Sequence, residues 1–197
     1  MPKIVDPEEK RTQIAYAAWS VIADGGLAAA TLRAVAAEAR MSMGAVQHYF
    51  DSKESMLLYA CQRMAGLAGT QWSDTSEGGT ARAKLDALAQ TSLTDHPLQR
   101  IGMATWGAFL SRASTDRAMA EIIQRTWRGA TEQAASLFAE AAHDAGLTLA
   151  QPPVDVADSF LALVDGLNTR VLAGNLSFAR ARELAGQFLD HHLEGPT

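Results

Sequence analysis

Side chains suited to contact a nucleic acid lie close together in one short segment. Its five candidate positions are Ser42, Met43, Gly44, Gln47 and His48. A glutamine amide can pair bidentately with adenine, and a methionine can contact the methyl group of thymine. A glycine lets the backbone approach a phosphate or a base edge closely. These residue types therefore favour base contacts in a DNA groove, provided that the segment is presented at a surface.

Residues on either side of this segment are suited to contact the DNA backbone. Thr31 and Ser42 are typical helix N-caps, and the free amides of helix N-termini attract phosphate. Arg33 can reach guanine, and Lys53 opens a further predicted helix where a backbone phosphate could lie. Residues 1–53 carry as many acidic as basic side chains, while the whole chain has a net charge of −5. Geometry, and not bulk charge, must therefore provide any affinity for DNA.

The elements that position these residues are three predicted helices, over about 8–24, 32–39 and 43–49. Only residues 40–42 separate the last two helices. A turn of that length between two short helices is typical of the helix-turn-helix motif, which places its second helix in the major groove. Spacing alone equally allows three packed helices with polar outer faces.

The remainder of the chain also has a helical pattern. Apolar residues recur at helical spacing over 116–145, 154–173 and 178–192, and no alternating run bounded by turn residues predicts a strand. Turn-forming residues interrupt the pattern at four places: 76–79, 95–97, 146–153 and 173–175. The sequence predicts an all-α fold of about nine helices, with a three-helix helix-turn-helix domain at the N-terminus.

The stretch from Thr31 to Leu57, and above all its end HYFDSKESML, resembles the DNA-binding domain of the TetR family of bacterial regulators. The resemblance is specific over about residues 8–60. Residues 101–128 are similar to the BetI-like subgroup of that family. The resemblance implies a DNA-binding domain over 1–53 and an all-helical domain for ligand sensing and dimerisation over 54–197.

The resemblance also implies which side chains contact DNA. The family's contacts from the second helix, the third helix and the following lysine match these positions: Thr31, Leu32, Arg33, Ser42, Met43, Gly44, Gln47, His48, Tyr49 and Lys53. Two positions depart from the family pattern. Gln47 stands where tyrosine is frequent, which replaces one phosphate contact by a possible base contact. Arg40 stands where glycine is usual, and a side chain at positive φ costs about 1 kcal/mol unless a phosphate contact compensates.

TetR-like proteins are homodimers, and two long amphipathic helices predicted over about 154–173 and 177–193 suit a four-helix bundle between subunits. The candidate interface residues are Phe160, Val164, Leu167, Val171, Phe178, Leu184 and Phe188. For each of them, a place in the core of a single chain is an equally good interpretation.

The resemblance further implies a small-molecule effector, which the sequence does not identify. Candidate ligand-binding residues are aromatic or polar groups on otherwise apolar helices: Trp72, Met103, Trp106, Phe109, Trp127, Phe138, Asp165 and Asn168. Such aromatic residues more often belong to a core than to a pocket. Asp165 and Asn168 are more informative, because burial would require partners for their polar atoms. Tryptophan faces together with a carboxylate would suit a cationic ligand.

Patterns typical of catalysis are absent from the sequence. No histidine stands four residues from a Glu or Cys, and there is no glycine-rich phosphate loop or Gly-x-Ser-x-Gly elbow. We therefore predict no catalytic residue, no metal and no cofactor. The N-terminus lacks an apolar signal core and no apolar run is long enough to span a membrane, which predicts a cytoplasmic protein without membrane contact.

The sequence thus predicts a ligand-responsive, homodimeric transcriptional repressor that binds palindromic operator DNA and is released from it by a small-molecule effector. Two other classes remain open. One is an all-α enzyme or carrier of small molecules with an incidental helix-turn-helix, and the other is a protein–protein adaptor. Sequence-specific, salt-dependent DNA binding would discriminate against both.

Overall fold

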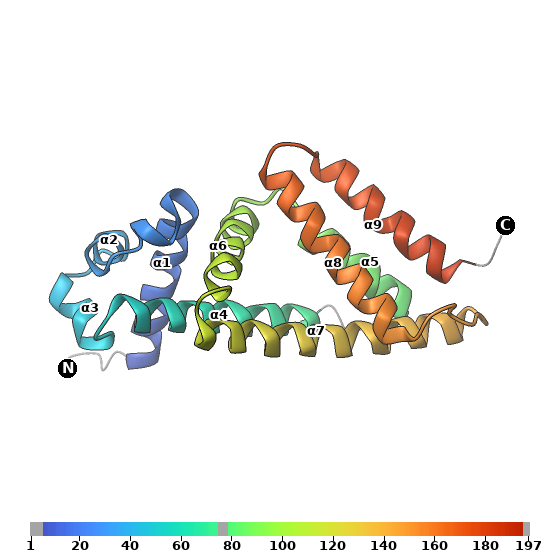
Figure 1. The fold of residues 1–197 in the computed structure, drawn as a ribbon, viewed down its shortest axis with the longest axis horizontal. Helices are drawn as coiled ribbons and strands as arrows, with labels where there is room; N and C mark the ends of the chain where they lie inside the picture. Colours follow the sequence, from blue (N-terminus) through green and yellow to red (C-terminus); the bar gives the residue numbers. More distant parts are fainter. Residues whose placement is uncertain (1–5, 75–78, 195–197) are drawn as a thin grey trace. The chain divides into compact units, whose positions relative to one another are not determined.

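A computed structural model describes the backbone of residues 6–74 and 79–194, and the side chains of residues 6–67 and 79–194. These residues form nine helices and no strand (Figure 1). The helices are α1 (Pro7–Ala29), α2 (Leu32–Glu38), α3 (Met43–Tyr49), α4 (Lys53–Asp74), α5 (Ala81–Ser92), α6 (Pro97–Ala113), α7 (Arg117–Asp144), α8 (Pro153–Leu172) and α9 (Phe178–Leu193). The predicted all-α fold is confirmed.

The chain divides into two compact units. The N-terminal unit runs to Leu67 and includes Ile101–Gln124, and the C-terminal unit contains Ala68–Arg100 and the chain from Arg125 onward. Three helices, α4, α6 and α7, therefore contribute residues to both units. The division into 1–53 and 54–197 stays a prediction about which residues bind DNA and which bind an effector.

Local sequence signals account for the first three helices. The hydroxyl oxygens of Thr31 and Ser42 accept hydrogen bonds from the amides of Ala34 and Ala45, both at 3.1 Å, which confirms the two predicted N-caps. Each such cap stabilises its helix by about 1 kcal/mol. The first helix extends beyond its predicted end to Ala29, although Gly26 interrupts it with φ 72° and ψ 179°. The predicted end of this helix near residue 24 therefore corresponds to an interruption inside α1, at Gly26.

Buried apolar side chains and three polar bonds hold the N-terminal unit together. Its core includes fully buried Ile14, Val35 and Val46. The Trp19 indole donates to the carbonyl of Ala60 at 3.1 Å, the Thr105 hydroxyl donates to the carbonyl of Trp19 at 3.1 Å, and the Gln13 amide donates to the carbonyl of Ala39 at 3.0 Å. These bonds tie α1 to α4, α6 and the end of α2.

Aromatic rings form the centre of the C-terminal unit. Phe138 meets Phe160 edge to face with ring centroids 5.7 Å apart, and Phe188 lies at the same distance from Phe160. At the periphery, the Arg82 guanidinium on α5 bonds Asp86 of its own helix and Asp190 of α9. The core thus joins α7, α8 and α9, and the ion pairs fasten α5 to α9.

The central position of Phe160 leads to a stability prediction. Because Phe160 is fully buried, Phe160→Ala leaves a cavity and lowers the free energy of unfolding by about 3–5 kcal/mol, measured by urea unfolding at one protein concentration. Leu98→Ala is the control, because Leu98 is 71% exposed and its truncation changes stability by less than about 0.5 kcal/mol. Equal losses in the two variants would contradict this packing.

Candidate nucleic-acid interface and effector site

The short helix α3 presents polar groups because only one of its side chains is buried. Val46 is that residue, and it is fully enclosed in the core of the N-terminal unit. Gly44, Gln47 and His48 are exposed. Their spacing of three and four residues places them on one helical face, on the side opposite to the buried valine. The structure therefore brings three of the predicted base-contacting residues together on an open surface.

The capping residues at the starts of α2 and α3 are also accessible. Thr31, Arg33 and Ser42 are exposed. The cap bonds use hydroxyl oxygens as acceptors, so each hydroxyl proton remains available for a phosphate oxygen. Leu32 and Tyr49 differ from these residues, because both are half-buried and pack against the core. These two side chains therefore help to hold α2 and α3 against the core, and they expose little area to DNA. Met43 is half-buried as well.

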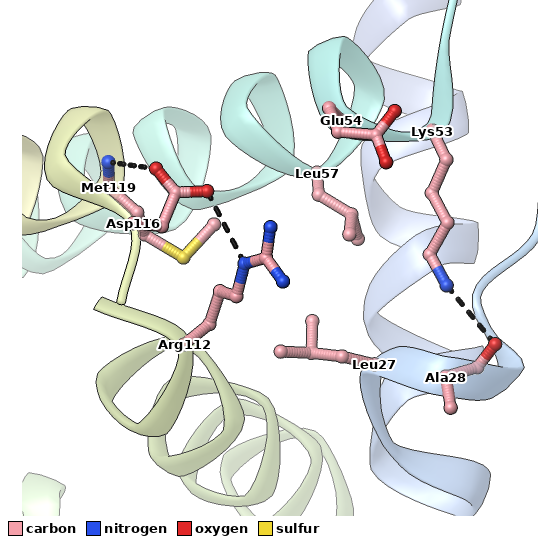
Figure 2. A pocket seen from close by; sticks show the side chains of 8 residues that line it. All are labelled: Leu27, Ala28, Lys53, Glu54, Leu57, Arg112, Asp116 and Met119. Atoms are coloured by element: carbon pink, nitrogen blue, oxygen red, sulfur yellow. Dashed lines mark hydrogen bonds and ion pairs between the residues drawn. The ribbon is translucent and has the colours of Figure 1, made fainter. Parts of the chain in front are cut away.

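Lys53 lies where α1, α4 and the α6–α7 turn meet. Its ammonium group donates to the carbonyl of Ala28 at 3.1 Å, as Figure 2 shows, which leaves two of its protons for other acceptors. It borders a cavity of about 330 Å³. The cavity is lined by Leu27, Ala28, Lys53, Glu54, Leu57, Arg112, Asp116 and Met119 (Figure 2). Arg112 and Asp116 pair there at 3.3 Å, and the Asp116 carboxylate also accepts from the Met119 amide at 3.2 Å, which caps α7.

A stack of side chains fixes the end of α3. The Arg11 guanidinium carbon lies 5.0 Å from the ring centroid of Phe50, the C-cap of α3, and 4.6 Å from that of Tyr59. The Tyr59 hydroxyl donates to Glu8 at 2.6 Å, and burial, followed by this bond, raises the pKa of Tyr59. Such cation–π contacts contribute about 0.5–2 kcal/mol. Sequence reasoning missed the role of Arg11, because only the fold places α1 beside Phe50.

The candidate effector residues fall into different environments. Met103 and Phe109 are buried and Trp106 is half-buried, all in the N-terminal unit. Phe138 is fully buried in the other core, whereas Trp127 is 43% exposed. Phe109 and Phe138 are fully buried, so both are core residues. Trp72 lies in α4, outside the residues whose side chains the structure describes.

Two polar side chains on α8 are distinctive. Asp165 and Asn168 are half-buried and stand three residues apart, so they share a helical face. Burial raises the pKa of the Asp165 carboxyl group. The Asn168 side-chain oxygen is buried and has no hydrogen-bond partner among the described residues. A buried, unsatisfied polar group costs about 1–3 kcal/mol, which an apolar residue would avoid. The pair is therefore a candidate for ligand recognition.

The seven candidate dimer residues divide into two groups. Four of them are already buried within their own unit, so their apolar area is removed from water without a second subunit. These are Phe160, Val164, Leu167 and Val171. The other three, Phe178, Leu184 and Phe188, are half-buried and retain accessible area. The interface itself stays a prediction.

Sequence profiles identify the family. Residues 14–60 match the profile described as bacterial regulatory proteins of the tetR family, and residues 81–194 match the BetI-type transcriptional repressor C-terminal profile. The second match alone covers more than half of the chain. This chain belongs to the TetR family. It is a transcriptional regulator of the repressor type with a BetI-type C-terminal domain.

Individual relatives agree with this assignment. The TetR-family chain is 29% identical to the transcriptional regulator BetI of Burkholderia cenocepacia, over 96% of this chain and 97% of that protein. It is 45% identical to the regulator PksA of Bacillus subtilis over 60 residues, which are 30% of this chain and 29% of PksA. Similarity to this BetI regulator thus extends over nearly the full length of both chains, while similarity to PksA is confined to a short segment.

Solved structures confirm the fold. A TetR-family regulator from Rhodococcus sp. superimposes with a TM-score of 0.84 at 23% identity, covering 94% of this chain and 100% of the other. A regulator from Saccharomonospora viridis, crystallised in complex with choline, gives a TM-score of 0.85 at 24% identity, covering 93% of this chain and 97% of the other.

In the described part of this TetR-family protein, no helix is long and apolar enough to cross a membrane. The same residues contain no group of three or more His, Cys, Asp or Glu arranged to hold a metal ion.

The buried carboxyl group leads to a pH-dependent prediction. Because burial raises the pKa of Asp165, ionisation destabilises the folded protein as the pH rises from the ordinary value of 3.8 through the shifted value. Asp165→Asn removes that ionisation and is expected to raise the melting temperature at pH 7, with a gain that shrinks as the pH falls. The exposed Asp155 in the first turn of α8 provides the control Asp155→Asn, which should bring no gain. A gain that does not depend on pH would rule out this origin.

Proposed function

We propose that this protein is a homodimeric repressor that binds palindromic operator DNA through α2 and α3 and leaves it when a small cationic effector binds the C-terminal unit. The observation that carries the DNA-binding part is the exposure of Gly44, Gln47 and His48 on one face of α3. A helix that is anchored by one valine presents almost its whole polar surface, which a packing role does not require.

The proposed contacts divide between bases and phosphates. Gln47 and His48 meet base edges in the major groove, and Gly44 permits close approach of the helix. The amides and hydroxyl groups at Thr31 and Ser42 bind phosphates on the two sides of the groove. Lys53 adds a further phosphate contact with the ammonium protons that the Ala28 carbonyl leaves free. Two such units bind half-sites that are about one helical turn apart.

Dimerisation is proposed to use the outer faces of α8 and α9. The half-buried Phe178, Leu184 and Phe188 supply apolar area there. The buried members of the predicted interface, such as Phe160, support this surface from inside the subunit. A bundle of two helices from each subunit would then fix the separation between the DNA-binding units.

The effector is proposed to bind at Asp165 and Asn168. A cation beside Asp165 favours the ionised carboxylate and compensates for its desolvation. The unpaired oxygen of Asn168 can accept a hydrogen bond from the same ligand. The choline complex of the S. viridis protein supports this ligand class, because choline is a cation. A cation that binds one conformation of the dimer better than the other shifts the population toward it and so changes DNA affinity.

Selection from random duplex DNA tests the proposed interface. Wild-type protein should enrich one palindrome, and Gln47→Ala should weaken binding to it by at least tenfold, because one bidentate base contact per half-site provides about 1–3 kcal/mol of discrimination. Binding isotherms at several salt concentrations provide the measurement, and the melting temperature should not change because Gln47 is exposed.

Gln133→Ala is the matched control, since it removes another exposed glutamine, from α7 in the C-terminal unit. This variant should bind the selected palindrome as the wild type does. Failure of the wild-type dimer to enrich any sequence would overturn the proposed function. Equal affinities of wild type and Gln47→Ala would instead remove Gln47 from the interface.

A further inference from the structure

The turn between α2 and α3 has a helix-ending geometry that normally requires glycine. The Met41 amide donates to the carbonyl of Ala36 at 2.9 Å, and the Arg40 amide donates to the carbonyl of Ala37 at 3.1 Å. This pair of bonds is the Schellman motif, whose residue after the C-cap adopts a left-handed conformation. That residue is Arg40, with φ of 55°.

The same chain ends two other helices with the same motif and uses glycine for it. At the end of α7, Gly146 has φ of 66°. Its amide donates to the carbonyl of His143 at 3.0 Å, and the amide of Leu147 donates to the carbonyl of Ala142 at 2.8 Å. At the end of α8, Gly174 has φ of 72° and donates to Val171 at 3.0 Å. Glycine meets the left-handed conformation without the clash that a Cβ atom creates.

Arg40 is the exception within the described chain, since every other residue with positive φ there is glycine. Its side chain is exposed, and among the described residues no ion pair or hydrogen bond of its guanidinium group offsets the strain. The helix-turn-helix turn is therefore less stable with arginine than with glycine. A strained residue without a compensating contact in the folded chain points to a function outside it.

We infer that Arg40 binds a phosphate of the DNA backbone next to the half-site that α3 reads. The inference rests on the proposed function, because it requires α3 to lie in the major groove. The turn leads directly into the start of α3, so Arg40 lies next to the helix that the proposed function places in the major groove (Figure 1). A guanidinium group can bind two phosphate oxygens at once.

The inference predicts that stability and DNA affinity change in opposite directions in Arg40→Gly. Removal of the strain should raise the melting temperature by about 2–4 °C. Loss of the phosphate contact in both subunits should weaken binding to the selected palindrome by at least tenfold. The slope of log affinity against log salt should also fall by about two, one for each subunit of the dimer. A residue with a purely structural role could not produce this combination.

Two further variants separate the charge from the conformation. Arg40→Lys keeps both the strain and a cation, so it should leave the melting temperature unchanged and retain most of the salt dependence. Arg128→Gln removes another exposed cation, from α7 in the C-terminal unit, and it should leave the salt slope unchanged. This control corrects for the change in net charge.

The results distinguish failure of the Arg40 phosphate contact from failure of the proposed function. If the wild type binds the palindrome and Arg40→Gly is more stable but binds equally well, the phosphate contact is wrong and the proposed function stands. A less stable Arg40→Gly would show that the arginine has a structural role, which also contradicts the inference. If the wild type enriches no DNA, the proposed function fails, and the inference fails with it.

Discussion

α3 has seven residues and one buried side chain, Val46, so it would not persist as an isolated helix. The N-terminal unit supplies what the helix lacks. Ser42 caps its first turn, and Phe50 at its end is enclosed by the core and lies under the Arg11 guanidinium. Tyr59 and Glu8 in turn hold the arginine stack in place. The polar face of α3 is free for DNA because these few contacts suffice to hold it.

Three helices run through both compact units of the regulator. α4, α6 and α7 each belong partly to the unit that presents α3 and partly to the unit that contains Asp165 and Asn168. In the N-terminal unit, Phe109 of α6 and Met119 of α7 are buried in the same core as Val46. A shift of these helices therefore displaces the packing that supports the DNA-binding surface. Under the proposed function, two alternative arrangements of this N-terminal core would be enough to couple effector binding to DNA affinity.

Arg40, Asp165 and Asn168 depart from what folding alone favours. Glycine would remove the strain at Arg40, and apolar side chains would remove the cost of burying Asp165 and the unpaired oxygen of Asn168. Such departures from local rules concentrate at functional sites. Arg40 lies beside α3 in the N-terminal unit, and the other two residues lie on α8 in the C-terminal unit. Each of them therefore lowers the stability of the unit that contains it, which is why they carry the proposed DNA and effector contacts.

The sequence by itself determined the helices, the caps at Thr31 and Ser42 and the helix-turn-helix spacing, because these depend on residues within a few positions of one another. The positive φ at Arg40 also follows from local sequence, because glycine is usual at that position of the turn. Only the tertiary structure decided that Phe160 belongs to the core of its own chain and Phe109 to the core of the N-terminal unit. Helical periodicity identifies which face of a helix is apolar. It does not identify which distant helix, or which subunit, covers that face.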